Sequence, residues 1–239
     1  AGFKAALSEA GLDVTYDTSN AQGDQTNVNS IASKYAAGDY DLVFAIATPM
    51  AQSIAQNVVD TPVLFTAVTD PVAAELVESN EAPGYNVTGT TDMNPVAKQI
   101  DLVKQVIPDA HKVGIIYSSG EVNSQVQVKL AKAEAKKQGL EVVEKTITNT
   151  AEVQQAAQTL TGVDAIFIPT DNTVVAALDS VLQVAEEKGI LTVAGEASSV
   201  NNGAALTLGL DYKTLGHQTG EMAVKILKGE AKPEAMPVE

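Results

Sequence analysis

Residues 165–172 read AIFIPTDN, an apolar run that ends in small polar residues. The same pattern occurs in LVFAIATP (42–49), VLFTAVTDP (63–71) and VGIIYSSG (113–120), with a weaker copy in ILTVAGEAS (190–198). Apolar residues on consecutive positions are typical of a parallel strand that is buried on both faces. The Thr, Ser, Asp or Asn at the end of each run is typical of a helix N-cap. The chain is therefore predicted to be a series of β–α units.

Strands and helices are predicted to alternate along the whole chain, which favours parallel sheets with right-handed crossovers. We expect strands near 13–17, 42–47, 62–67, 86–90, 112–117, 141–146, 164–168, 190–194 and 204–208. We expect helices near 1–10, 26–37, 49–58, 71–76, 95–107, 123–138, 150–160, 172–188 and 213–228. Both halves have the same order of elements, so we predict two Rossmann-like lobes. One lobe comprises residues 1–92 with 211–239, and the other comprises residues 93–210.

Composition excludes several kinds of partner and site. The formal charge of −15 argues against nucleic acid and against anionic membrane surfaces as partners. The absence of cysteine excludes disulfides, a thiolate nucleophile and Cys-ligated metal. All 15 cationic residues are lysine, so no bidentate arginine clamp can bind a carboxylate or phosphate. An anionic group of a ligand would have to be bound by lysine, hydroxyls or backbone N–H groups.

Polar residues gather where the predicted strands end. Parallel strands bring these ends to one edge of a sheet, where open α/β folds bind ligands. Asp70 and Asp171 occupy corresponding strand ends in the two halves, so each is either a helix N-cap or a partner for a ligand amine. Glu196 follows Gly195 at another strand end and is either a ligand contact or a solvated loop residue. This pattern favours a binding cleft between the two lobes.

Two further segments are candidates for ligand contact. Thr48–Pro49 begins a helix, and the amides of Met50 and Ala51 are expected to be free to bind a carboxylate. The segment 118–124 has five polar residues in seven after a buried strand, although an ordinary surface loop with an N-cap is the alternative. The complete set of candidate binding residues is Thr48, Pro49, Asp70, Ser118, Ser119, Glu121, Asn123, Ser124, Thr170, Asp171, Asn172, Glu196, Asp211 and Tyr212.

Catalytic motifs are missing from the sequence. GxGxxG, the P-loop and GxSxG are absent, and the two histidines lie near no plausible nucleophile. Carboxylates are plentiful, but none has the spacing of a metal-ligand set. Catalysis by paired carboxylates stays open as the alternative. We therefore predict a protein that is not an enzyme and that uses no cofactor and no metal.

Five strings resemble one known family: AQGD (21–24), FAIATPMAQ (44–52), AVTDPVAAELV (67–77), IPTDNTV (168–174) and GLDYKTLGHQTGEMAVKILKG (209–229). They are similar to the tryptophan/tyrosine-type substrate-binding proteins of ABC importers, which have the type I periplasmic-binding-protein fold. The resemblance covers essentially the whole chain. It implies a receptor of two lobes joined by three crossovers, which binds an aromatic or hydrophobic L-amino acid between them. A sugar or other small-molecule receptor, or a ligand-sensing regulator domain of the same fold, is the alternative.

The resemblance also implies partners and a location. We expect an ABC permease and ATPase as partners, a monomeric protein, and an extracytoplasmic location as a periplasmic protein or a cell-surface lipoprotein. The chain opens with the helix-like AGFKAALSEAGLDV (1–14) and ends at MPVE (236–239), where a strand would begin. We therefore expect a chain shortened at both ends, without its export signal and without the first strand of lobe 1.

Overall fold

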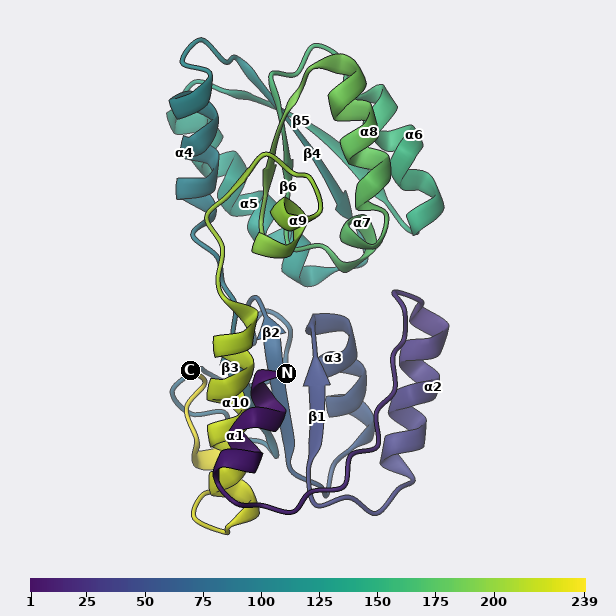
Figure 1. Cartoon of the computed structure of the whole chain (residues 1–239), viewed down its shortest axis with the longest axis vertical. Coiled ribbons are helices and arrows are strands. Elements are labelled where there is room, and N and C mark those ends of the chain that lie inside the picture. Colours follow the sequence, from purple (N-terminus) through teal and green to yellow (C-terminus); the bar gives the residue numbers. More distant parts are fainter. The chain divides into compact units, whose positions relative to one another are not determined.

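Two parallel β-sheets organise the chain in the computed structural model, which describes all residues from 1 to 239 (Figure 1). One sheet belongs to unit 1, which comprises Ala1–Met93 and Asp211–Glu239. The other belongs to unit 2, which comprises Asn94–Leu210. Every neighbouring pair of strands is parallel, so the predicted α/β class with parallel sheets is confirmed.

Unit 1 contains a three-stranded sheet in the order β1-β2-β3. Its strands are β1 (Val43–Ile46), β2 (Val63–Val68) and β3 (Val87–Thr91). Its helices are α1 (Gly2–Glu9), α2 (Gln25–Ala36), α3 (Thr48–Asn57) and α10 (Tyr212–Leu227), followed by a 3-10 turn, η2 (Pro233–Ala235). Helix α10 packs on α1 and on strands β2 and β3, and the Phe3 ring stacks on Phe44 with 3.9 Å between ring centroids.

Unit 2 contains a five-stranded sheet in the order β5-β4-β6-β7-β8. Its strands are β4 (Lys112–Ser118), β5 (Glu141–Ile147), β6 (Ala165–Ile168), β7 (Leu191–Ala194) and β8 (Leu206–Thr207). Its helical segments are α4 (Val96–Val106), α5 (Val122–Lys137), η1 (Thr150–Glu152), α6 (Val153–Thr159), α7 (Asn172–Ala176), α8 (Leu178–Lys188) and α9 (Ala197–Asn201).

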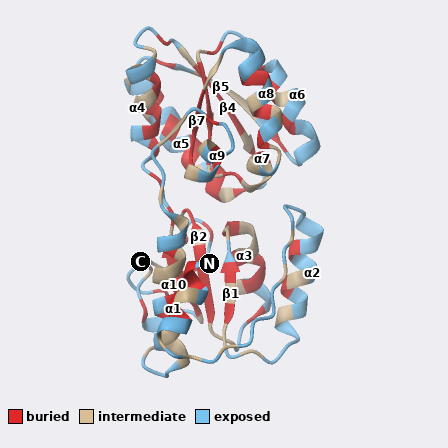
Figure 2. Ribbon diagram, viewed as in Figure 1, coloured by how far each residue is buried: buried red, intermediate tan, exposed pale blue.

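The central strands of unit 2 are buried on both faces, as their continuous apolar runs predict (Figure 2). All four residues of β6 are buried. Ala165 and Phe167 join the core cluster under α4 and α5, whereas Ile166 and Ile168 join the cluster under α6, α7 and α8. Helices therefore cover both faces of this sheet, and its carboxyl edge is left for polar residues.

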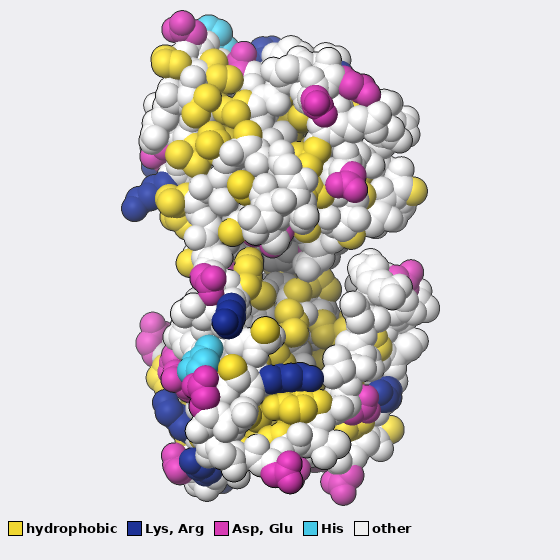
Figure 3. All heavy atoms as spheres, viewed as in Figure 1, with side chains coloured by type: hydrophobic (Ala, Val, Ile, Leu, Met, Phe, Trp, Pro, Cys, Tyr) yellow, Lys and Arg dark blue, Asp and Glu magenta, His cyan; other side chains and the backbone are white.

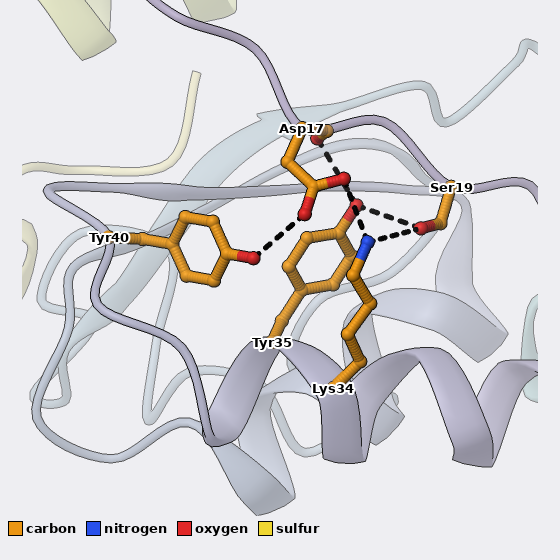
Figure 4. Close-up of polar contacts among 5 residues, drawn as sticks. All are labelled: Asp17, Ser19, Lys34, Tyr35 and Tyr40. Atoms are coloured by element: carbon orange, nitrogen blue, oxygen red, sulfur yellow. Dashed lines mark hydrogen bonds and ion pairs between the residues drawn. The ribbon is translucent and has the colours of Figure 1, made fainter.

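The strand predicted near residues 13–17 is wrong, because this segment forms no strand. A strand needs a neighbouring strand for its backbone N–H and C=O groups, and no strand pairs with this segment. Side chains hold it instead. Lys34 Nζ donates to Asp17 Oδ1 at 2.7 Å and the Tyr40 hydroxyl donates to Asp17 Oδ2 at 2.8 Å (Figure 4). The hydrogen bond from Lys34 is the main reason that the pKa of Asp17 lies below its ordinary value.

Three further elements differ from the prediction. Residues 71–76 form turns and not a helix, and the positive φ of Glu75, 58°, interrupts the helical path. The helix predicted at 172–188 is broken at Ala177, whose φ of −120° and ψ of 30° separate α7 from α8. Helix α9 was not predicted, because its five residues give no apolar periodicity.

The outer edge of β1 has no neighbouring strand, and two of its four residues are not fully buried, unlike those of a parallel strand covered on both faces. Ile46 is 59% exposed, and Phe44 is only partly buried. Figure 3 shows hydrophobic side chains in a hollow on this face of unit 1, over β1 between α1 and α2. No helix in the chain combines the length and the hydropathy that crossing a membrane requires.

Two glycines of α10 provide a matched test of its packing on α1. A Cβ atom at Gly220 would lie 2.6 Å from Ala6 Cβ and 2.8 Å from the Phe3 carbonyl oxygen. We expect Gly220→Ala to lower the free energy of unfolding by about 1–3 kcal/mol through overpacking. At Gly216 the nearest atom, the Phe3 nitrogen, would be 3.5 Å away, so Gly216→Ala should be neutral or stabilising by up to about 1 kcal/mol. Chemical denaturation of both variants measures the difference, and equal stabilities would contradict this account.

Candidate functional site

Two neighbouring strand-to-helix junctions of unit 2 meet at the carboxyl edge of its sheet. Strand β4 leads into α5 through residues 118–121, and β6 leads into α7 through residues 169–171. Because β4 and β6 are adjacent and parallel, both junctions lie at the same end of the sheet. Seven predicted site residues come together here: Ser118, Glu121, Asn123, Ser124, Thr170, Asp171 and Asn172.

Asp171 joins the two junctions through its carboxylate. Its Oδ1 accepts from the backbone N–H of Val174 at 2.8 Å, so it is the N-cap of α7. Its Oδ2 accepts from the backbone N–H of Ser118 at 2.6 Å and from the Ser124 hydroxyl at 2.7 Å. The N-cap alternative is therefore confirmed for Asp171, and contact between Asp171 and a ligand stays a prediction.

Glu121 makes the reciprocal connection from the other junction. It precedes α5, yet its carboxylate binds the first turn of α7. Its Oε2 accepts from the backbone and side-chain nitrogens of Asn172 at 2.9 and 2.7 Å. Its Oε1 accepts from the backbone N–H and the hydroxyl of Thr173 at 2.9 and 2.8 Å. We call Glu121, Asp171 and the donors around them the cross-cap.

The cross-cap buries two acidic side chains close to each other. Asp171 is 1% exposed and Glu121 is 6% exposed. Burial, and secondly the charge of Glu121, raises the pKa of Asp171 to about 6, although three hydrogen bonds to its carboxylate act in the opposite direction. With this pKa the Asp171 carboxylate is mostly ionised at pH 7, and a cationic group nearby would favour its ionised form.

The other two candidates of unit 2 lie beside the cross-cap. The Glu196 carboxylate accepts from the hydroxyls of Ser198 and Ser199 at 2.5 and 3.0 Å, in the first turn of α9. Gly195 lies against Thr170, because a Cβ atom at position 195 would be 2.7 Å from the Thr170 nitrogen. The β7 end is therefore close to the β6 end. Ser119 is exposed and donates to the Ile147 carbonyl oxygen at 3.4 Å.

In unit 1, Thr48 and Pro49 begin α3 as predicted, and Thr48 is buried. The expectation that both following amides are free is wrong for Ala51, whose N–H donates to the Ala47 carbonyl oxygen at 3.0 Å. No side chain caps α3. Ala47 has φ 74° and ψ 152°, a conformation that is rare outside glycine and costs about 1–3 kcal/mol. This strained residue sets the direction in which α3 leaves β1.

The acidic candidates of unit 1 are helix or turn caps. Asp70 accepts from the backbone N–H of Ala73 at 3.0 Å, in the turn after β2. Asp211 accepts from the backbone N–H of Thr214 at 2.6 Å and is the N-cap of α10. That bond is the main reason that the pKa of Asp211 lies below its ordinary value. Both residues retain the role of candidate ligand contacts as predictions.

Asp92 is a buried acid that the sequence interpretation missed as a site residue. Its Oδ2 accepts from the Tyr212 hydroxyl at 2.8 Å, and its Oδ1 accepts from the Thr69 hydroxyl at 3.3 Å. Asp92 follows β3, whereas Tyr212 is the first residue of α10, 120 positions later. From the sequence we expect a helix near 95–107 and assign no role to the residues just before it. The signal that could have identified Asp92 is its position at the carboxyl end of a strand, where Asp70 and Asp171 also lie, each within three residues of the last strand residue.

Within each unit the strand ends offer hydroxyls and carboxylates to a small polar molecule, and unit 1 adds the start of α3, which no side chain caps. No group of three or more His, Asp and Glu side chains is placed to hold a metal ion.

Comparisons with known proteins agree with this description. A family model described as ABC transporter substrate binding protein matches residues 1–239. The chain is 43% identical over 235 residues to the tyrosine-binding protein of Clostridioides difficile, an alignment that covers 96% of this chain and 68% of that protein.

Two solved structures are similar over the whole chain. An ABC domain from Streptococcus pneumoniae in complex with L-Trp matches with a TM-score of 0.95 at 37% identity, covering 100% of this chain and 82% of that one. A substrate-binding protein with adhesive properties from Clostridium difficile, in a ligand-free, open structure, matches with a TM-score of 0.71 at 45% identity and with the same coverage. The predicted type I periplasmic-binding-protein fold is confirmed by these matches.

The cross-cap predicts a large effect of one uncharged substitution. Glu121→Gln replaces one acceptor oxygen with an NH₂ group, which then faces the donors of either Asn172 or Thr173. We expect the free energy of unfolding to fall by about 1–3 kcal/mol, because a buried donor loses its acceptor. Glu186→Gln on the exposed face of α8 is the matched control and should change it by less than about 0.5 kcal/mol. Urea denaturation measures both, and an unchanged stability for Glu121→Gln would show that the cross-cap stabilises nothing.

The raised pKa of Asp171 predicts a pH-dependent difference between wild type and Asp171→Asn. The folded protein binds this proton with a pKa of about 6, whereas an unfolded aspartate has an ordinary value of 3.8. Protonation therefore favours folding, and the stability it contributes is present below pH 4 and lost as pH rises through 6. Relative to Asp171→Asn, wild type should gain roughly 2–3 kcal/mol on going from pH 7 to pH 4. A stability difference that does not change with pH would contradict the raised pKa.

Proposed function

The chain belongs to the family of ABC transporter substrate-binding proteins, and from this premise we propose that it binds an aromatic L-amino acid, tyrosine or tryptophan, for an ABC importer. The observation that carries the proposal is the 43% identity to a protein named for tyrosine binding, sustained over nearly the whole chain. The related complex that holds L-Trp extends the same ligand class to a second relative.

The charge of the candidate residues supports a zwitterionic ligand. The strand ends of unit 2 present Glu121, Asp171 and Glu196, which attract an ammonium group and repel a phosphate or a dianion. Since the chain has no arginine, the groups that remain for the ligand carboxylate are lysine, hydroxyls and backbone N–H groups, and we propose the last two. The places we propose for it are the start of α3, which lacks a side-chain cap, and the hydroxyls of Ser118 and Ser119. The backbone N–H groups of these two serines already donate to Asp171 and to the Ile147 carbonyl oxygen.

The remaining parts of the proposal follow from the family. The ligand lies between the lobe of residues 1–92 with 211–239 and the lobe of residues 93–210, and closure of the lobes lets both contact it. The protein releases the ligand unchanged, without catalysis, to a permease and ATPase complex. It acts as an extracytoplasmic monomer, either in the periplasm or as a lipoprotein. The candidate residues of both lobes contribute ligand contacts in this proposal.

Thermal unfolding with added ligands tests the proposal. At a tyrosine or tryptophan concentration 100 times the Kd, the free energy of unfolding should rise by about 2.7 kcal/mol. N-acetyl-tyrosine should give no such shift, because acetylation removes the positive charge of the amine. Glucose and inorganic phosphate are the further controls. A shift with glucose alone would replace the proposal with a sugar receptor, and tyrosine and tryptophan that both leave the unfolding unchanged would contradict it.

A further inference from the structure

The two acids of the cross-cap have little capacity left for a ligand. Asp171 accepts three hydrogen bonds and Glu121 accepts five, all from groups of unit 2. A carboxylate has about four lone-pair sites in total. An ammonium that bound directly to Glu121 would have to displace the capping bonds of α7. Asp171 keeps one site, but it is 1% exposed, so we look to other atoms for the direct acceptors of a cationic ligand group.

Two oxygens beside these acids accept no hydrogen bond. They are Asn123 Oδ1 and Thr170 Oγ1, and both atoms are buried. An acceptor left without a partner in this way is costly and calls for an explanation. The two residues are neighbours, because Asn123 Nδ2 donates to the Thr170 carbonyl oxygen at 2.8 Å. Asn123 is 3% exposed, whereas Thr170 is only partly buried, so a ligand would approach the two covered oxygens from the Thr170 side.

The orientation of the Asn123 amide is fixed by its surroundings. Nδ2 donates to Glu121 Oε2 at 3.0 Å as well as to the Thr170 carbonyl oxygen. A flipped amide would place Oδ1 against both of these oxygens, which carry no proton to donate. Glu121 therefore holds Asn123 with its free oxygen directed away from the carboxylate. The result is a neutral acceptor pair held beside two buried negative charges.

We propose that Asn123 Oδ1 and Thr170 Oγ1 accept hydrogen bonds from the α-ammonium of the ligand, while Glu121 and Asp171 attract it without touching it. This inference rests on the proposed function. It names the atoms that accept hydrogen bonds from the ligand amine, which the proposed function does not specify. It also differs from the expectation that Asp171 contacts the amine. The acids supply the negative potential, and the neutral pair supplies the directional bonds.

Thr170→Val is the sharpest test, because it removes the hydroxyl and keeps the shape of the side chain. Titration calorimetry with L-tyrosine and L-tryptophan should show a loss of affinity of about 10- to 150-fold, the range for a hydrogen bond to a charged group. Thr170→Ser keeps the hydroxyl and should stay within about threefold of wild type. Thr161→Val, an exposed site near the opposite end of β6, is the matched control and should change nothing.

The deaminated analogue, 3-(4-hydroxyphenyl)propionate, identifies which part of the ligand is bound. It should bind wild type more weakly than tyrosine does, or not measurably, and Thr170→Val should add no further loss. If Thr170→Val weakened binding of the analogue by the same factor as it weakens binding of tyrosine, the assignment of these oxygens to the ammonium group would be wrong.

The two proposals fail in different ways. If wild type binds tyrosine but Thr170→Val binds it equally well, this inference is wrong and an ordered water serves the two oxygens. A Thr170→Ser variant as weak as Thr170→Val overturns it too, because shape and not the hydroxyl would then decide. If wild type binds neither amino acid, the proposed function fails, and this inference fails with it.

Discussion

The polar edge of unit 2 depends on the exchange of caps between Glu121 and Asp171. Each residue stands at the start of one helix and bonds to backbone N–H groups of the other junction. A carboxylate at a helix start is favourable because the first N–H groups have no partner inside the helix. Here the donors lie on neighbouring β–α units, so the same bonds fix the distance between β4 and β6 at their polar ends. Asn123, Ser124 and Thr170 take their positions from this arrangement.

Unit 1 organises its strand ends differently. Its caps are local, as at Asp70 and Asp211, and each binds an N–H three residues further along the chain. Long-range order comes from Asp92, which binds the Tyr212 hydroxyl, and from three buried threonine hydroxyls, Thr66, Thr90 and Thr219, that hydrogen-bond to one another. Two alanines with positive φ, Ala47 and Ala67, stand at the ends of β1 and β2. Such strained backbone conformations persist only where the surrounding structure holds them, and they are common at functional sites.

Much of the fold could be predicted because its determinants are local. Apolar runs gave the central strands, and Asp171 and Asp211 follow the simple rule for N-caps. The strand near 13–17 could not be excluded from sequence, since strand formation depends on a partner elsewhere in the chain. The reach of Glu121 to α7 crosses 51 positions, and the Asp92–Tyr212 bond crosses 120, so neither leaves a local pattern. An alanine gives no hint of positive φ, which is why Ala47 was not singled out.

The hydrogen bonds of the cross-cap are complete without a ligand, and we propose that the ligand binds beside it. Native-state hydrogen exchange at the backbone amides of Ser118, Asn172 and Thr173 tests this most directly, because these N–H groups donate to the two buried carboxylates. We expect all three amides to be protected in the absence of ligand, and saturating tyrosine to slow their exchange only as much as it slows exchange in the rest of unit 2. Amides that exchange freely until tyrosine is added would contradict this expectation. Such a result would mean that Glu121 and Asp171 do not accept hydrogen bonds from these amides until a ligand binds.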